Sequence, residues 1–122
     1  MLLVVMQLVV VVGVLSWGGI VLTVDRQRVS NAADLAALAG AQAMRDPVPR
    51  DIVNVPAWRA EHACGRAGVI AGANGALLTS CALDGPDVVV TAARQPAPLV
   101  ETALGWLGHR LPLVRQVARA GP

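Results

Sequence analysis

The chain has 122 residues, of which 55% are hydrophobic and 15% charged, and its formal net charge at pH 7 is +2. The positive charge comes from arginines spread along the chain, which is not the basic patch typical of a nucleic-acid-binding protein. The residues that follow an initial apolar run are enough for one small domain. The hydrophobic core of a domain of that size would by itself give only marginal stability.

The N-terminal part of the chain is apolar. The first charged residue is Asp25, and residues 1–24 are interrupted only by Gln7 and Ser16. A run of this length crosses a bilayer as one helix. A cleavable secretory signal would have basic residues before a shorter apolar run and small residues after it, and this run has neither. Residues 1–24 therefore predict a transmembrane helix that is retained as an anchor.

Residues 25–46 are predicted to extend this helix out of the bilayer, because they contain no proline up to residue 44 and are rich in alanine and leucine. Small residues and one valine recur there at three- and four-residue steps, a stripe suited to close packing against a sheet or another helix. This stripe consists of Val29, Ala32, Ala36, Ala39 and Gly40. Three prolines within residues 47–56 then predict a loop.

A second helix is predicted over residues 55–74, with Asn54 as its N-cap and Gly75 as its terminator. Its inward side should follow alternating steps of four and three residues, and its polar side should be separate. The predicted inward residues are Ala60, Cys64, Ala67, Ala71 and Asn74, and the predicted polar residues are Arg59, His62 and Arg66.

The rest of the chain indicates a small sheet. Residues 76–83 and 87–93 are strand-like and are separated by Asp-Gly-Pro, which predicts an antiparallel hairpin. Residues 99–107 have apolar positions at helical spacing, and residues 113–120 can form a third strand. The predicted fold class is α+β: a long transmembrane helix continues into a small domain, residues 57–122, with a second helix and a short antiparallel sheet.

The cysteines Cys64 and Cys81 predict one disulfide in an oxidising compartment, worth about 3 kcal/mol for the loop it closes. Free or intermolecular thiols are the alternatives. His62 cannot activate Cys64 as a catalytic base, because residues two apart on a helix point about 200° apart. The same geometry removes His62 from a zinc site with the cysteines and His109, and the chain has neither CxxC nor HxxxH. We expect no enzyme activity, metal or cofactor.

The orientation signals conflict. Arg26 and Arg28 directly follow the membrane run, and the positive-inside rule would place the domain in the cytoplasm. The cysteine pair favours the exterior. Because Asp25 interleaves with the arginines, we predict a single-pass cell-membrane protein with its C-terminal domain outside the cytoplasm.

Several residues are candidates for helix contacts. Gln7 and Ser16 can hydrogen-bond between membrane helices. Asp34 can pair with an arginine of a neighbouring subunit or be solvated, and Trp106 can pack in the core, which we predict, or touch the bilayer surface. The predicted helix-packing and assembly residues are Ser16, Gly19, Thr23, Asp34, Ala36 and Gly40.

Short motifs occur in order along nearly the whole chain. They are the apolar helix, NAADLAALAGA at residues 31–41, AC at 63–64, ANGA at 73–76, the cysteine at 81, DVVV at 87–90 and ARAGP at 118–122. This set resembles the TadE/TadG-like proteins of the tight-adherence pilus systems of high-G+C Gram-positive bacteria.

The resemblance implies a non-enzymatic pilin-like component, a minor pilin or pseudopilin of a Tad-type pilus or a type II/IV-like secretion machine. The implied partners are the lipid bilayer and other pilin-like subunits or Tad-type assembly and secretion proteins, with no nucleic acid and no small-molecule substrate. Residues 1–12 contain neither the basic leader nor the early glutamate usual in pilin precursors. A membrane-anchored accessory binding protein that enters no filament is therefore the alternative, and a small envelope enzyme is a distant third.

Overall fold

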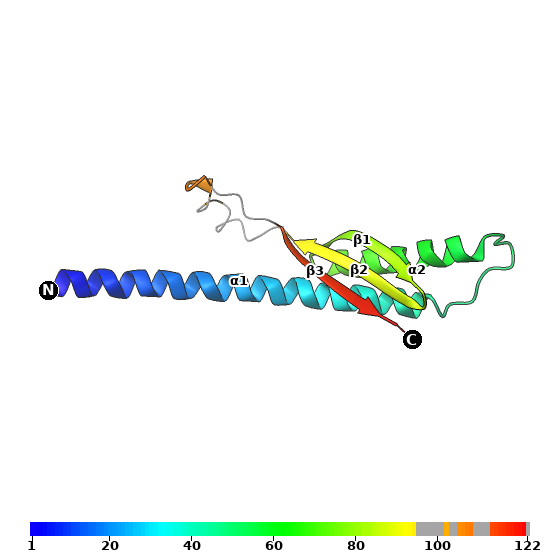
Figure 1. Cartoon of the computed structure of the whole chain (residues 1–122), viewed down its shortest axis with the longest axis horizontal. Coiled ribbons are helices and arrows are strands. Elements are labelled where there is room, and N and C mark those ends of the chain that lie inside the picture. Colours follow the sequence, from blue (N-terminus) through cyan, green and yellow to red (C-terminus); the bar gives the residue numbers. More distant parts are fainter. Residues whose placement is uncertain (95–101, 103–104, 109–112, 122) are drawn as a thin grey trace.

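The structure, a computed structural model, describes residues 1–94, 102, 105–108 and 113–121. It contains a very long helix, a second helix and a three-stranded antiparallel sheet, which confirms the predicted α+β fold. In chain order these are α1 (Leu2–Ala43), α2 (Val55–Ala73), β1 (Leu77–Asp84), β2 (Asp87–Arg94) and β3 (Val114–Ala120). Figure 1 shows the sheet and α2 gathered along the C-terminal half of α1, while its N-terminal half extends away from them.

Helix α1 is continuous over 42 residues, so the apolar run and its polar extension form one rod. It ends at Ala43, before the predicted limit of residue 46. The chain turns there, because the Arg45 amide donates to the Gln42 carbonyl at 3.0 Å and the Asp46 amide to the Ala43 carbonyl at 3.1 Å. Pro47 also disfavours a helical conformation at Asp46.

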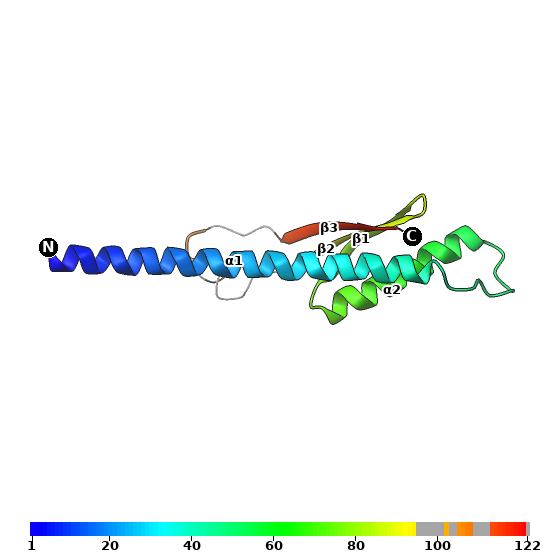
Figure 2. The ribbon, with the colours of Figure 1, turned by 90° about the horizontal axis from the view of Figure 1, so that it is seen from below.

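Helix α2 begins and ends as predicted, to within one residue. The Asn54 side-chain oxygen accepts a hydrogen bond from the Ala57 amide at 3.1 Å, which is an N-cap contact. At the other end Gly75 has φ +70°, a conformation that glycine adopts without strain. The helix runs back along α1 and is joined to it by residues 44–54 (Figure 2).

The strands follow one another as β1-β2-β3, and each neighbouring pair is antiparallel. The predicted hairpin and third strand are both confirmed, and Gly85 supplies the positive φ of the turn at +61°. An irregularity between Leu78 and Ser80 shifts the register of β1. The helix predicted over residues 99–107 lies largely outside the described residues.

The core lies between one face of the sheet and the two helices. Strand β3 contacts α1, β1 contacts α2, and β2 contacts both helices. Most buried side chains are alanines, and the largest fully buried ones are Val29, Val88 and Val90. Small side chains on α1 therefore allow the sheet and α2 to approach it closely.

The sequence prediction for the inward side of α2 is partly wrong. The buried residues of α2 are Ala63, Ala67 and Ala71, which follow four-residue steps along the side facing α1. Asn74 is exposed, because it caps the end of the helix, where its side-chain amide donates to the Ile70 carbonyl at 2.8 Å. Ala60 and Cys64 are half-buried at the margin of this line.

The predicted core position of Trp106 is also wrong, since this residue is 90% exposed. The core is lined by alanines and valines in close contact, and an indole ring is too large for the space between them.

Candidate functional site

The small-residue stripe of α1 packs against the rest of the domain. Ala36 is fully buried, and a Cβ atom on Gly40 would stand 3.0 Å from Val88 Cγ1 and 3.2 Å from the Ala63 carbonyl oxygen. Of the two predicted partners for this stripe, a sheet or another helix, the domain itself supplies both. Ala36 and Gly40 are therefore not accessible to a second subunit.

The opposite side of the same helix is exposed. We call this side the outer face of α1, and it consists of Gln27, Asn31, Asp34, Leu35 and Leu38. The spacing of these residues places them on one side of the helix. Leu35 and Leu38 are 46% and 49% exposed, so this polar face also carries apolar surface.

The outer face continues into the apolar half of α1. Ser16 precedes Asp34 by about five full turns, so the two residues lie on the same side. The predicted residues Ser16, Gly19 and Thr23 are all exposed. The Thr23 hydroxyl lies within hydrogen-bond distance of the Gly19 and Ile20 carbonyl oxygens, at 2.9 and 2.8 Å, so its polar group is satisfied within the helix.

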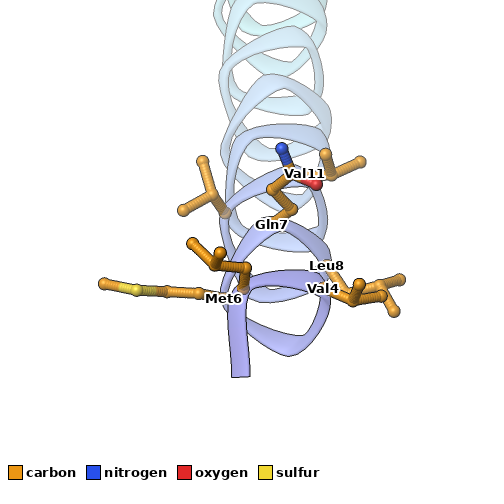
Figure 3. Close-up of a pocket in the computed structure, with 7 residues that line it drawn as sticks. Val4, Met6, Gln7, Leu8 and Val11 are labelled. Carbon is orange, nitrogen blue, oxygen red and sulfur yellow. The ribbon is translucent and has the colours of Figure 1, made fainter. Parts of the chain in front are cut away.

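The apolar half of α1 is long and apolar enough to cross a membrane, and none of its most apolar window is buried by the rest of the chain. A shallow depression near its start is shown in Figure 3. It is lined by Leu3, Val4, Met6, Gln7, Leu8, Val10 and Val11. Gln7 supplies an amide within this otherwise apolar lining, and this amide can bond to another helix at the same depth.

The predicted disulfide is confirmed. Cys64 of α2 and Cys81 of β1 are bonded, with their Cα atoms 5.8 Å apart. Because these are the two cysteines of the chain, no thiol is left to act as a nucleophile or metal ligand. The bond attaches α2 to an edge strand of the sheet, and in the chain-entropy model its loop adds about 3 kcal/mol to the free energy of unfolding.

The polar side of α2 contacts the chain that leaves α1. His62 Nε2 forms a hydrogen bond with Asp46 Oδ2 at 2.7 Å, and the His62 ring stacks on Trp58 with centroids 4.8 Å apart. Arg59 donates to the Met44 carbonyl. As predicted, His62 does not pair with Cys64, which is bonded to Cys81. The contact of His62 with Asp46 was not predicted. These contacts fix the start of α2 against the end of α1.

An ion-pair cluster lies at the hairpin end of the sheet. Arg119 of β3 contacts Asp87 Oδ2 at 2.5 Å and Asp84 Oδ2 at 3.0 Å. The hydrogen bond that the Arg119 guanidinium donates to Asp87, together with the negative charges of Asp87 and Asp84, raises the pKa of Arg119 above its ordinary value. This cluster was not predicted, because it depends on the register that pairs β3 with β2.

The described residues place no group of three or more His, Cys, Asp or Glu side chains close enough to hold a metal ion. The chain matches no protein-family model, no curated protein and no solved structure. The feature that stands out is therefore α1 itself, with one side packed in the domain and the other side exposed from the apolar half to its end.

Proposed function

We propose that this protein is a membrane-anchored, pilin-like structural and assembly component, a minor pilin or pseudopilin of a Tad-type pilus or related secretion machine. The observation that carries the proposal is the continuity of α1. A single 42-residue helix combines a candidate membrane span with the packing centre of a small domain. Such a rod transmits position and force between the membrane and the domain without a flexible joint.

The domain leaves the outer face of α1 exposed, which supports an assembly role. A neighbouring helix can lie along this face from Ser16 to Leu38 without displacing the sheet or α2. Asp34 offers a carboxylate to such a neighbour, and Leu35 and Leu38 offer apolar contact. In the membrane, the small residues Ser16 and Gly19 lie on this side and suit close helix contact. Gln7 precedes Ser16 by two and a half turns, so its amide faces the other side of α1 and would meet a different helix.

The proposed location is the cell membrane, with the domain outside the cytoplasm. The Cys64–Cys81 disulfide supports this orientation, because disulfides persist in oxidising compartments. Arg26 and Arg28 would favour the opposite orientation. In this proposal the disulfide outweighs them.

The alternative is an accessory binding protein that uses the same face of α1 and enters no filament. The two roles differ in where the protein is found. A filament subunit is released with sheared surface fibres, whereas an accessory protein stays in the membrane fraction with its partners.

Co-purification from native membranes tests the assembly role. We compare the parent chain with Leu38→Arg on the outer face and with the control Val69→Arg on α2, where Val69 is 67% exposed. Leu38→Arg should lose the pilus or secretion components, while Val69→Arg should keep them. If Leu38→Arg retains every partner, the outer face of α1 is not the assembly surface.

A further inference from the structure

A large aromatic side chain projects from the short described stretch between β2 and β3. Trp106 is 90% exposed and its neighbour Leu107 is 71% exposed. The backbone there forms a local turn, since the Trp106 amide donates to the Thr102 carbonyl at 3.3 Å and the Gly108 amide to the Gly105 carbonyl at 3.2 Å. Gly108 has φ +71°, which ends the turn. Two adjacent apolar side chains are thus largely exposed in this turn.

This turn lies toward the apolar half of α1. Strand β2 ends and β3 begins at the end of the sheet nearer the apolar half of α1, whereas the hairpin lies at the opposite end (Figure 1). Residues 105–108, drawn in orange, lie still further toward the N-terminus of α1. Figures 1 and 2 agree that they are level with its apolar half along the long axis. The turn therefore lies on the side from which α1 would enter a membrane.

The charges at this end of the domain are mostly positive. Residues 25–30, 73–77, 92–94 and 113–116 make up its described part. They contain Arg26, Arg28, Arg94 and Arg115, and Asp25 as the acidic residue. At the opposite end, acidic residues accompany the arginines, as Asp84 and Asp87 accompany Arg119.

Tryptophan and arginine in this arrangement suit the surface of an anionic bilayer. The indole ring is apolar with one N–H donor and prefers the level of the lipid headgroups. Arginines near an anionic surface are attracted to it, each by about 1 kcal/mol, or roughly fivefold in binding. Both features occur at the one end of the domain that faces the apolar half of α1.

We propose that Trp106 and Leu107 insert at the headgroup level of the bilayer that α1 spans, with Arg94 and Arg115 facing anionic lipid headgroups. The inference rests on the membrane anchoring in the proposed function. The turn then forms a second attachment beside α1, and two attachments fix the tilt of the domain on the membrane.

The three tryptophans of the chain allow a direct test in the full-length protein. Trp17 lies in the apolar half of α1, Trp58 lies at the start of α2 at the far end of the domain, and Trp106 lies in the turn. Three variants each retain one tryptophan, with phenylalanine at the other two positions. Each variant is reconstituted in phosphatidylcholine–phosphatidylglycerol vesicles that contain lipids brominated either near the headgroup or deep in the acyl chains.

The Trp106-only variant should be quenched most by bromine near the headgroup. The Trp17-only variant should be quenched by bromine within the acyl chains, and the Trp58-only variant should be unquenched. If Trp106 behaves as Trp58 does while Trp17 is quenched, the second attachment is wrong and the anchor stands. If Trp17 is not quenched, the anchor itself fails, and with it the proposed function.

The contribution of charge is measured on the same Trp106-only protein. Arg94→Gln and Arg115→Gln should each weaken the docking of the turn by about fivefold, and vesicles without anionic lipid should reproduce the loss. Quenching of Trp106 that is independent of both arginines and of anionic lipid would overturn the charge part of the proposal. Shielding of Trp106 in native membranes, without quenching in the vesicles, would indicate a protein partner and overturn the proposal as a whole.

Discussion

Gly40 of α1 and Val88 of β2 approach so closely that a Cβ atom on Gly40 would stand 3.0 Å from Val88 Cγ1. The same atom would lie 3.2 Å from the Ala63 carbonyl oxygen of α2. Glycine at this position therefore sets the distance at which α1, α2 and the sheet meet.

Gly40→Ala should destabilise the domain by about 1–3 kcal/mol through overpacking, offset in part by the roughly 1 kcal/mol that alanine gains over glycine within a helix. Gly65→Ala in α2 is the matched control, because a Cβ atom there meets nothing within 4 Å. The control should be neutral or stabilised. Chemical denaturation in detergent, followed by circular dichroism, measures both, and equal stability of the two variants would contradict the close approach.

Removal of the disulfide should weaken the domain without changing its fold. The double variant Cys64→Ser and Cys81→Ser should lose about 3 kcal/mol in the free energy of unfolding, because the unfolded chain is no longer constrained by the crosslink. Reduction of the parent protein is the control and should give the same loss. Complete labelling of both cysteines by an alkylating reagent without reductant would show that the bond is not formed.

The domain should face the exterior. A reporter that is active only in an oxidising exterior, fused after Pro122, should be active, and a cytoplasm-only reporter should be silent. The positive-inside contribution is tested in the same assay by Arg26→Gln with Arg28→Gln, which should leave the result unchanged. An active cytoplasmic reporter on the parent chain would mean that these arginines determine the orientation, and it would also conflict with the disulfide.

Two arginine substitutions on α1 should separate folding from assembly. Ala36→Arg should unfold the domain, because Ala36 is fully buried and a charged side chain there lacks a partner. Leu38→Arg should fold normally, since Leu38 is half-exposed, and should lose assembly partners. A third variant, His62→Ala on α2, should retain the assembly partners. Protease resistance of the domain reports folding, and a Leu38→Arg variant that is as protease-sensitive as Ala36→Arg would remove this distinction.

Local signals in the sequence predicted most of the elements. The absence of proline up to residue 44, the cap at Asn54, and Gly75 and Gly85 at turns each act within a few residues, and the structure follows them. The inward face of α2 was partly mispredicted, because which alanines are buried depends on the angle at which α1 crosses α2.

The side-chain contacts were harder to predict, because they join distant parts of the chain. Asp46 meets His62 only after α2 folds back along α1, and Arg119 meets Asp84 only after β3 adds to the sheet. The exposure of Trp106 was also hard to predict, because it depends on which residues line the core. The core is lined mostly by alanine, which leaves no space for an indole ring.

The most direct test of the central claim is crosslinking along the outer face of α1 in living cells. A photoreactive amino acid is placed at Ile20 or Leu38, which lie about five turns apart on one side of the helix. Val69 on α2, which is also exposed, is the control position. We predict that Ile20 and Leu38 both form adducts with a second copy of the chain or with another envelope protein bearing an apolar helix, and that Val69 does not. Adducts from Val69 alone, with the disulfide intact in all three variants, would contradict assembly through α1.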